Sequence, residues 1–345
     1  AQQEGDAQPG ADASGDTTAP SGSEDTDAEA PEGGADPPIA LAAAGASVNQ
    51  RLQGADRYAT AVQVSKHAYP SASGGTVIVA TGENYPDALS AAPLAAKRSA
   101  PLLLTLTAGI PDSTLGEINR LKPKHILIIG SESAVSAAVK TQLENLRWQG
   151  AGPQVRRISG ADRYETSAAI AREGWGTPTG SGFVANAFVV TGEGYADALS
   201  AGAAASRING PVLLVPGMGT AAPGGVTAVL ANTARLYVAG STAVVSDAVL
   251  ASLTAGSART LVARYAGTDR YDTSAKIANA LFSAPATTSY WATGSGFADA
   301  LAGAAVAGAR GVPLLLALPD CVPTAVYDAN DRVNPGGAYL LGSPA

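Results

Sequence analysis

The sequence predicts an α/β protein made of three tandem, small, three-layer modules, each with a parallel sheet. Four motifs return in the same order three times, about 106 residues apart, which is the size of a small domain and too long for a solenoid repeat. Within each copy, short apolar runs alternate with helix-like segments, as expected for buried parallel strands covered on both faces. We expect repeat 1 at residues 47–152, repeat 2 at 153–259 and a C-terminally shortened repeat 3 at 260–345.

The motifs are too long and too well ordered to recur by chance. They are Arg-x-x-Gly-x-Asp-Arg-Tyr-x-Thr, then Thr-Gly-x-x-aromatic-x-Asp-Ala-Leu, then Pro before an apolar triplet, and finally Gly-Ser after an apolar run. In chain order they begin at Arg51, Thr81, Pro101 and Gly130; at Arg157, Thr191, Pro211 and Gly240; and at Arg264, Thr293, Pro313 and Gly342.

Each repeat begins with a short strand and a capped helix. In repeat 1 the strand is Val48–Leu52, and Gly54-Ala-Asp56 then turns into a helix. An Asp at this point can accept a hydrogen bond from the first turn of the helix, and Glu165 adds a capping-box-like residue in repeat 2. The N-cap residues expected are Asp56, Asp162 and Asp269.

In the central part of each repeat, the sequence predicts a buried strand, then a helix of small residues and then a second buried strand. The apolar run Thr76–Thr81 is the first strand, and a helix rich in Ala follows from about Asp87. Leu102–Leu106 is the second strand. The predicted caps of the small-residue helix in the three repeats are Asp87, Asp197 and Asp299.

The last part of each repeat predicts a helix, a strand and a further helix. In repeat 1 these are Ser113–Leu121, His125–Ile129 and Ala134–Leu146. Repeat 3 has no such last helix after Gly342-Ser343, so we expect the edge of its sheet to be incomplete or covered by a neighbour.

The N-terminal residues 1–46 predict a disordered acidic tail rich in Ala, Gly, Pro and Ser. The first 38 residues hold ten acids and no base, so the other 307 residues carry 22 bases against 19 acids, a formal charge of +3. Because the chain starts with Ala, we expect a processed chain or a fragment.

Several function classes are disfavoured by composition. The sequence has one cysteine and two histidines, too few for a metal site built on these residues or for His-dependent catalysis. We therefore expect no metal, no cofactor and no enzymatic activity. The possible nucleophiles Ser90 and Ser200 have no hydroxyl at the equivalent position of repeat 3. The possible acid–base groups Glu83 and Glu193 are replaced there by Ser295. No apolar run is long enough to cross a membrane.

The arginine residues are the candidates for binding an anionic ligand. The chain has 16 Arg against 6 Lys, and the planar guanidinium fork binds phosphate or carboxylate in bidentate fashion. Arg98, Arg207 and Arg310 recur just before the Pro-apolar motif and have no repeated acid beside them, so they are candidate anion contacts. Arg57, Arg163 and Arg270 either bind the ligand or form internal ion pairs.

The Thr-Gly-x-x-aromatic motif lies where a parallel strand ends, the usual place for a ligand in an open α/β sheet. Its aromatic residues could stack on a sugar ring; the alternative is that glycines make the turn and the aromatic rings pack internally. The candidates are Gly82, Gly192, Gly294, Tyr85, Tyr195 and Phe297.

Together, these motifs resemble the bacterial cell wall-binding repeat 2 family over residues of about 47–343. The resemblance implies a secreted Gram-positive surface protein with three Toprim-like modules around a pseudo-threefold axis, without nuclease activity. It also implies that an apolar triplet in each repeat takes part in anchoring. The triplet residues are Leu102, Leu103 and Leu104, then Val212, Leu213 and Leu214, and then Leu314, Leu315 and Leu316.

The expected function is non-covalent anchoring to an anionic wall polymer, teichoic-acid-like or another secondary wall polysaccharide. The expected partner list holds no nucleic acid, because +3 is a weak charge for binding it, and no membrane. We expect a monomer with an internal pseudo-trimer. The alternatives are an accessory of a wall hydrolase or peptidase, and a surface adhesive or structural protein with a protein ligand.

Overall fold

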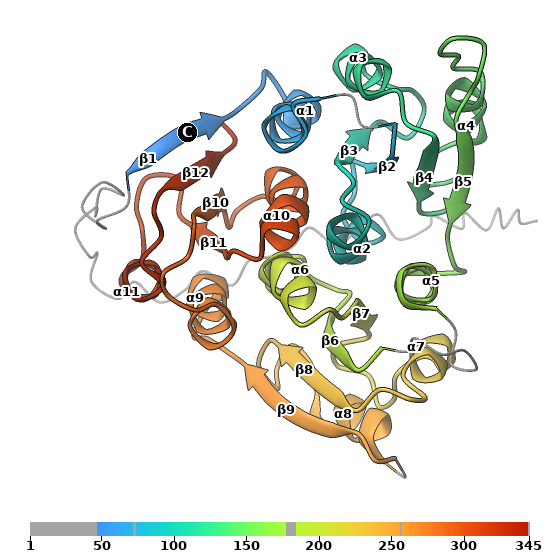
Figure 1. The fold of residues 1–345 in the computed structure, drawn as a ribbon. Coiled ribbons are helices and arrows are strands. Elements are labelled where there is room, and N and C mark those ends of the chain that lie inside the picture. The colour runs from blue at the N-terminus through green and yellow to red at the C-terminus, as the bar shows by residue number, and fades with distance from the viewer. Residues whose placement is uncertain (1–46, 72–73, 177–183, 256, 344–345) are drawn as a thin grey trace, which may run out of the picture. The chain divides into compact units, whose positions relative to one another are not determined.

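The computed structural model describes residues 47–71, 74–176, 184–255 and 257–343, and all of them fall in one compact unit. The predicted tail at 1–46 lies outside these residues. The described chain forms three four-stranded parallel sheets with helices between the strands, which confirms the predicted α/β class (Figure 1). No helix in the described ranges is both long and apolar enough to span a bilayer.

Each sheet is assembled from two neighbouring repeats. The strand order of the first is β3-β2-β4-β5, of the second β7-β6-β8-β9 and of the third β1-β12-β10-β11. Their bounds are β3 Leu102–Thr105, β2 Thr76–Thr81, β4 His125–Ile129 and β5 Gln154–Ile158; β7 Val212–Val215, β6 Asn186–Thr191, β8 Arg235–Ala239 and β9 Thr260–Tyr265; β1 Val48–Leu52, β12 Ala338–Leu341, β10 Ser289–Thr293 and β11 Leu314–Ala317.

The sheets are therefore offset by one strand from the expected bounds 47–152, 153–259 and 260–345, which mark the sequence repeats. The first strand of repeats 2 and 3 pairs with the last strand of the preceding repeat. The first strand of repeat 1, β1, pairs with β12 of repeat 3, from Val48 beside Ala338 to Leu52 beside Leu341. Each of the three sheets therefore includes the first strand of another repeat. The edge of the third sheet is thus covered by a neighbour.

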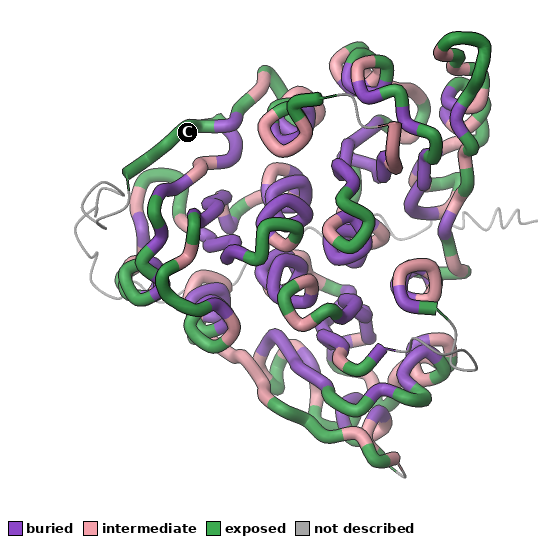
Figure 2. The backbone as a smooth tube through the Cα atoms, in the orientation of Figure 1, coloured by how far each residue is buried: buried purple, intermediate pink, exposed green. Residues whose placement is uncertain are grey.

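Three helices of small residues pack against one another at the centre (Figure 1). They are α2 Ala91–Lys97, preceded by the 3-10 turn Ala88–Ser90, then α6 Ala196–Arg207 and α10 Ala298–Arg310. Pro93 explains the late start of α2, because it has no N–H to donate to the carbonyl of Leu89. Figure 2 shows that these central helices are largely buried.

The remaining helices cover the sheets or link the repeats. They are α1 Arg57–Ala68, α5 Arg163–Trp175 and α9 Arg270–Leu281; α3 Asp112–Leu121, α7 Gly224–Val229 and α11 Thr324–Val333; α4 Ala137–Glu144 and α8 Asp247–Thr254. Alternate residues of β2 face opposite layers: Ile78 and Ala80 join the central core, while Val77 and Val79 join an outer core. The three-layer module is therefore present in each repeat pair.

Candidate functional site

Each junction between repeats is held by a half-buried Asp and a buried Thr. The Thr166 hydroxyl of repeat 2 hydrogen-bonds to Asp87 of repeat 1, and Thr273 bonds in the same way to Asp197. Thr60 of repeat 1 bonds to Asp299 of repeat 3, so the pattern runs around all three repeats. Each Thr oxygen also accepts the N–H of a loop glycine, Gly54, Gly160 or Gly267.

The predicted capping role of Asp87, Asp197 and Asp299 is wrong. None of the three central helices has a side-chain N-cap hydrogen bond, and the N-cap residues of α6 and α10 are Tyr195 and Phe297. The carboxyl groups instead reach across to the next repeat. Asp56, Asp162 and Asp269 do cap their helices, accepting from the N–H of Ala59, Glu165 and Asp272.

The Gly-Ser motif supplies the second wall of each junction. Gly130, Gly240 and Gly342 have φ of 99°, 110° and 87°, which side-chain-bearing residues rarely adopt. A Cβ on Gly130 or Gly240 would lie 2.7 or 2.9 Å from the carboxyl oxygen of Asp87 or Asp197. Only glycine lets the loop approach the buried carboxyl group, which explains the recurrence of the motif.

Arg57, Arg163 and Arg270 each hydrogen-bond within their own repeat, and Arg270 also donates to the Tyr195 hydroxyl of repeat 2. Each guanidinium donates to the carbonyl of the strand-end glycine, Gly82, Gly192 or Gly294, at 2.5–2.8 Å. A Cβ on these glycines would collide with Tyr58, Tyr164 or Tyr271 of the Asp-Arg-Tyr motif, at 2.5–2.7 Å. The glycines therefore allow a close approach of the helix to the strand end.

The aromatic candidates pack against one another. Tyr85, Tyr195 and Phe297, one from each repeat, have ring centroids 5.4–6.1 Å apart, edge-on or tilted. The guanidinium carbons of Arg57 and Arg270 lie 5.7 Å from the centroids of Phe297 and Tyr195. The internal-packing alternative therefore accounts for these rings, which hold the three repeats together at the strand-end face.

Two of the junctions open as clefts at this face. The cleft between repeats 1 and 2 has a volume of about 610 Å³ and is lined by hydroxyl, carboxyl and guanidinium groups, including Thr81, Glu83, Ser133, Asp162 and Arg163. The cleft between repeats 3 and 1 has about 470 Å³ and includes the equivalent Asp56, Arg57 and Ser295. Hydroxyl and charged groups in such a cleft can hydrogen-bond a glycan.

The apolar triplets cannot touch a ligand. Leu102, Leu103 and Leu104 are 0–2% exposed, and so are their counterparts in β7 and β11. The role implied by the resemblance is therefore corrected to an indirect one: the triplets form strands that position the loops of the clefts.

The anion contact predicted for Arg98, Arg207 and Arg310 is not a repeated site. Arg98 pairs with Glu173 at 2.7 Å, and Arg310 donates to the Tyr290 hydroxyl beside His67. Arg207 is exposed and forms no ion pair within the described ranges.

The three arginines are also not equivalent positions. The left-handed residues Ser99, Asn209 and Gly311 end the central helices at matching points, so the counterpart of Arg98 and Arg310 is Ile208. Arg207 therefore corresponds to Lys97, one residue earlier on the helix.

The Asp197 carboxyl group, at the junction of repeats 2 and 3, should make the free energy of unfolding depend on pH. Burial raises the pKa of Asp197 to about 6, against the opposing effects of Thr273 and Arg270. Between about pH 4 and 6 the folded chain keeps a proton that the unfolded chain has lost, so stability should fall as pH rises, by roughly 2–3 kcal/mol. Urea unfolding at pH 4, 5, 6 and 7 should show this slope, and Asp197→Asn should flatten it; an unchanged slope in the variant would contradict the assignment.

The sequence profile of the family described as Cell wall binding domain 2 (CWB2) matches residues 51–140, 157–250 and 264–345. The chain belongs to the CWB2 family. The three matches coincide with the three repeats, so the resemblance drawn from the motifs is confirmed.

Two similar proteins are longer than this chain. N-acetylmuramoyl-L-alanine amidase LytC of Bacillus subtilis is 31% identical over 85% of this chain and 55% of its own length. The amidase enhancer of the same organism is 32% identical over 81% of this chain and 36% of its own. The chain thus spans about half or less of these relatives.

Solved structures agree with the CWB2 assignment. Cwp6 from Clostridium difficile superposes with a TM-score of 0.76 at 26% identity, over 87% of this chain and 46% of that one. Cwp8 from the same organism gives 0.75 at 28% identity, over 88% and 50%.

Sequence reasoning missed the Thr and Tyr of the first motif. Thr60, Thr166 and Thr273 are 1–3% exposed and join the repeats, and Tyr58 packs on Gly82. The signal was their recurrence in all three copies, but recurrence alone does not say which residue of another repeat each one meets.

Proposed function

We propose that this chain holds a secreted protein on the bacterial cell wall without a covalent bond, by binding a repetitive anionic polymer with its three repeats. The observation that carries the proposal is the threefold recurrence of one strand-end junction around a shared core. Three weak contacts on one body reinforce one another, because the second and third become effectively intramolecular. β1 completes the third sheet within one chain, which supports a single chain as the binding unit.

The chemistry of the junctions supports an anionic polysaccharide as ligand. Arg57 and Arg163 line the two clefts, and each gives one N–H to a neutral carbonyl, which leaves the guanidinium charge in place. The remaining N–H groups of the fork suit phosphate or carboxylate, while neighbouring hydroxyls suit sugar oxygens. Teichoic-acid-like chains and other charged wall polysaccharides both have this chemistry.

A wall-retention assay tests the proposal. The full chain should sediment with purified Gram-positive walls, and the bound fraction should fall at least about tenfold after the anionic polymers are extracted, since the multivalent contacts are lost together. Equal retention on the extracted peptidoglycan would show that the ligand is not the anionic polymer. Partial release by salt is expected, because exposed charges are screened.

The relatives favour a second candidate, an accessory role beside a wall amidase. By name, one of them is an amidase and the other an amidase enhancer. If this role applies, wall digestion by an added amidase should speed up when the full chain is present. Lysis of walls by the chain alone would instead show a hydrolase.

A further inference from the structure

A groove of about 310 Å³ lies between β5 and α5, the first strand and the first helix of repeat 2 (Figure 1). Its charged lining residues are Arg156 and Arg157 of β5 and Arg172 and Glu173 of α5. Three guanidinium groups against one carboxylate give this lining a formal charge of +2. The β5–α5 groove is therefore a place that attracts an anion.

Glu173 is already shared between two arginines. Its Oε1 atom accepts from Arg156 at 2.6 Å and from Arg98 of repeat 1 at 2.7 Å. The Glu173 side chain is 13% exposed, whereas that of Arg156 is 59% exposed. One carboxylate carries one negative charge, so it balances one of the two guanidinium groups and leaves the other uncompensated.

Arg172 adds a further positive charge on the helix side of the groove. It is half-buried, and within the described ranges its side chain forms no ion pair and no hydrogen bond. The Ser159 hydroxyl lies in the same groove, and Ile158 and Ala169 supply apolar surface. The guanidinium N–H groups of Arg172 are therefore available to an incoming anion.

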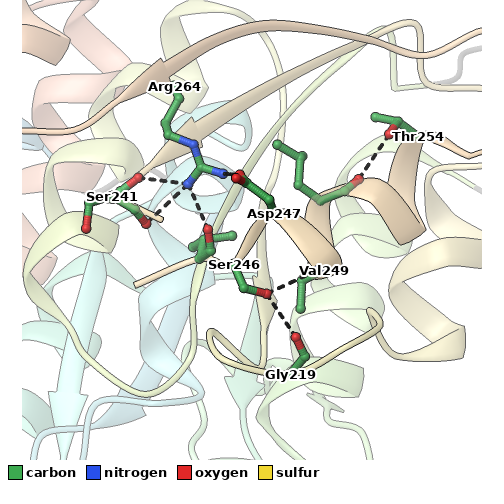
Figure 3. A network of polar contacts seen from close by, with 10 residues as sticks. Gly219, Ser241, Ser246, Asp247, Val249, Thr254 and Arg264 are labelled. Carbon is green, nitrogen blue, oxygen red and sulfur yellow. Dashed lines mark hydrogen bonds and ion pairs between the residues drawn. The ribbon is translucent and has the colours of Figure 1, made fainter. Parts of the chain in front are cut away.

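Arg157 lacks the acidic partner that its counterpart in repeat 3 has. Figure 3 shows that counterpart, Arg264, bound to backbone carbonyls of the Gly-Ser segment and to the Asp247 carboxylate at 3.0 Å. Arg157 makes the corresponding backbone hydrogen bonds at 2.6–2.8 Å, but Ala137 takes the position of Asp247. Burial lowers the pKa of Arg157, and the charge of Glu132 opposes this only in part. The positive charge that an acid balances beside β9 is therefore unbalanced beside β5.

The arginines of this groove are not a feature of every repeat. The counterparts of Arg156 in repeats 1 and 3 are Gln50 and Ala263, and those of Arg172 are Lys66 and Asn279. Both repeats nevertheless form the same strand and helix. The fold does not require the accumulated charge, and a ligand of opposite charge would account for it.

The arrangement suits the chemistry of a phosphate group. One guanidinium fork comes from a strand and the other from a helix, and each fork can bind two oxygens of an anion. A tetrahedral phosphate has oxygens for two forks and for a hydroxyl at once, whereas a carboxylate has two oxygens in one plane.

We propose that the β5–α5 groove binds a phosphate group, which the guanidinium groups of Arg156 and Arg172 hold and to which the Ser159 hydroxyl donates. The same groups would hold a free phosphate ion or a phosphate that links the units of a polymer. The groove shares no lining residue with the two strand-end clefts, so the proposal does not depend on the proposed wall-binding function.

The test is a nuclear magnetic resonance titration of the full chain, isotopically labelled in arginine, with inorganic phosphate at low ionic strength. The Nε–Hε signals of Arg156 and Arg172 should shift in a saturable manner. Arg172→Gln should weaken binding at least about tenfold, because hydrogen bonds between charged groups are among the strong ones. Its unfolding temperature should equal that of the natural chain, since the Arg172 side chain has no partner to lose within the described part of the chain.

Arg235→Gln is the matched control. Arg235 is exposed on β8, outside the groove, so the variant loses the same charge and should keep its affinity for phosphate. Ser159→Asp places a carboxylate in the groove and should abolish binding. Equal affinities of the Arg172 and Arg235 variants, or shifts that do not saturate, would overturn the proposal, because they would show general attraction to a positive surface.

A second titration identifies the source of the phosphate. A glycerol phosphate oligomer that binds the groove more tightly than inorganic phosphate would show that the ligand is a phosphate-linked polymer, and weaker binding would show that it is a free ion. Wall sedimentation of the natural chain is a separate measurement. A chain that fails to bind walls but binds phosphate in the groove would contradict the proposed function and leave this site in place.

Discussion

The Gly202→Leu chain should unfold at a temperature roughly 5–10 °C lower and lose wall retention. Gly202 lies where α2, α6 and α10 meet, and a Cβ there would already lie 3.3 Å from the Cβ atoms of both Ala92 and Ala304. A leucine must push at least one helix away from the other two. Overpacking of this kind costs about 3 kcal/mol, which corresponds to the stated shift for a domain of this size.

Gly202→Ala is the matched control. Its methyl group fits with small adjustments, and the gain in helix propensity offsets the tight contact, so its stability should lie within about 1 kcal/mol of the natural chain. Calorimetry and wall sedimentation measure both variants. A Leu variant as stable as the Ala variant would mean that the three helices are not in close contact at this position.

The double variant Ser133→Trp and Ala243→Trp should retain its fold and lose at least about tenfold in wall binding. Ser133 lines the cleft between repeats 1 and 2, and Ala243 is the equivalent exposed position beside repeats 2 and 3. The indole rings would cover the cleft between repeats 1 and 2 and the equivalent strand-end surface between repeats 2 and 3, and would leave the cleft between repeats 3 and 1 open. A polymer held at several sites loses affinity steeply when it can reach one, because the linked contacts multiply.

The control for this prediction is Gln142→Trp. Gln142 is exposed on α4, away from the clefts, and adds the same aromatic surface. Sedimentation with purified walls at several chain concentrations gives the apparent affinity of each variant. If the double variant binds as well as Gln142→Trp, the strand-end surfaces at Ser133 and Ala243 do not contribute to wall binding.

Local sequence was sufficient for most elements of the fold. The strands predicted at Thr76–Thr81 and His125–Ile129 have the same bounds in the structure, because continuous apolar runs are buried on both faces. The last helix of repeat 1 was predicted from Ala134 and begins at Ala137, since Ser136 accepts the capping hydrogen bond. Such differences of a few residues reflect which of several nearby residues caps the helix.

The candidate site was predicted less well than the fold. The motif containing Asp87 was correctly placed at a strand end, but its carboxyl group binds Thr166 of the next repeat rather than its own helix. The triplet Leu102–Leu104 is core, not contact surface. An Asp can cap its own helix or bind a distant side chain, and a leucine can lie in the core or on a contact surface. Which role applies depends on a neighbour far away in sequence.

The threefold repeat, the α/β class and the caps at Asp56 and its counterparts can be read from local sequence, because periodicity and capping depend on residues a few positions apart. The pairing that lets β1 complete the third sheet, and the contact of Arg51 with Gly342, 291 residues away, appear only in the folded chain. The same is true of the edge-on and tilted contacts among Tyr85, Tyr195 and Phe297. Those pairings follow from the packing of three equivalent units around one core, where each surface meets a residue from another repeat.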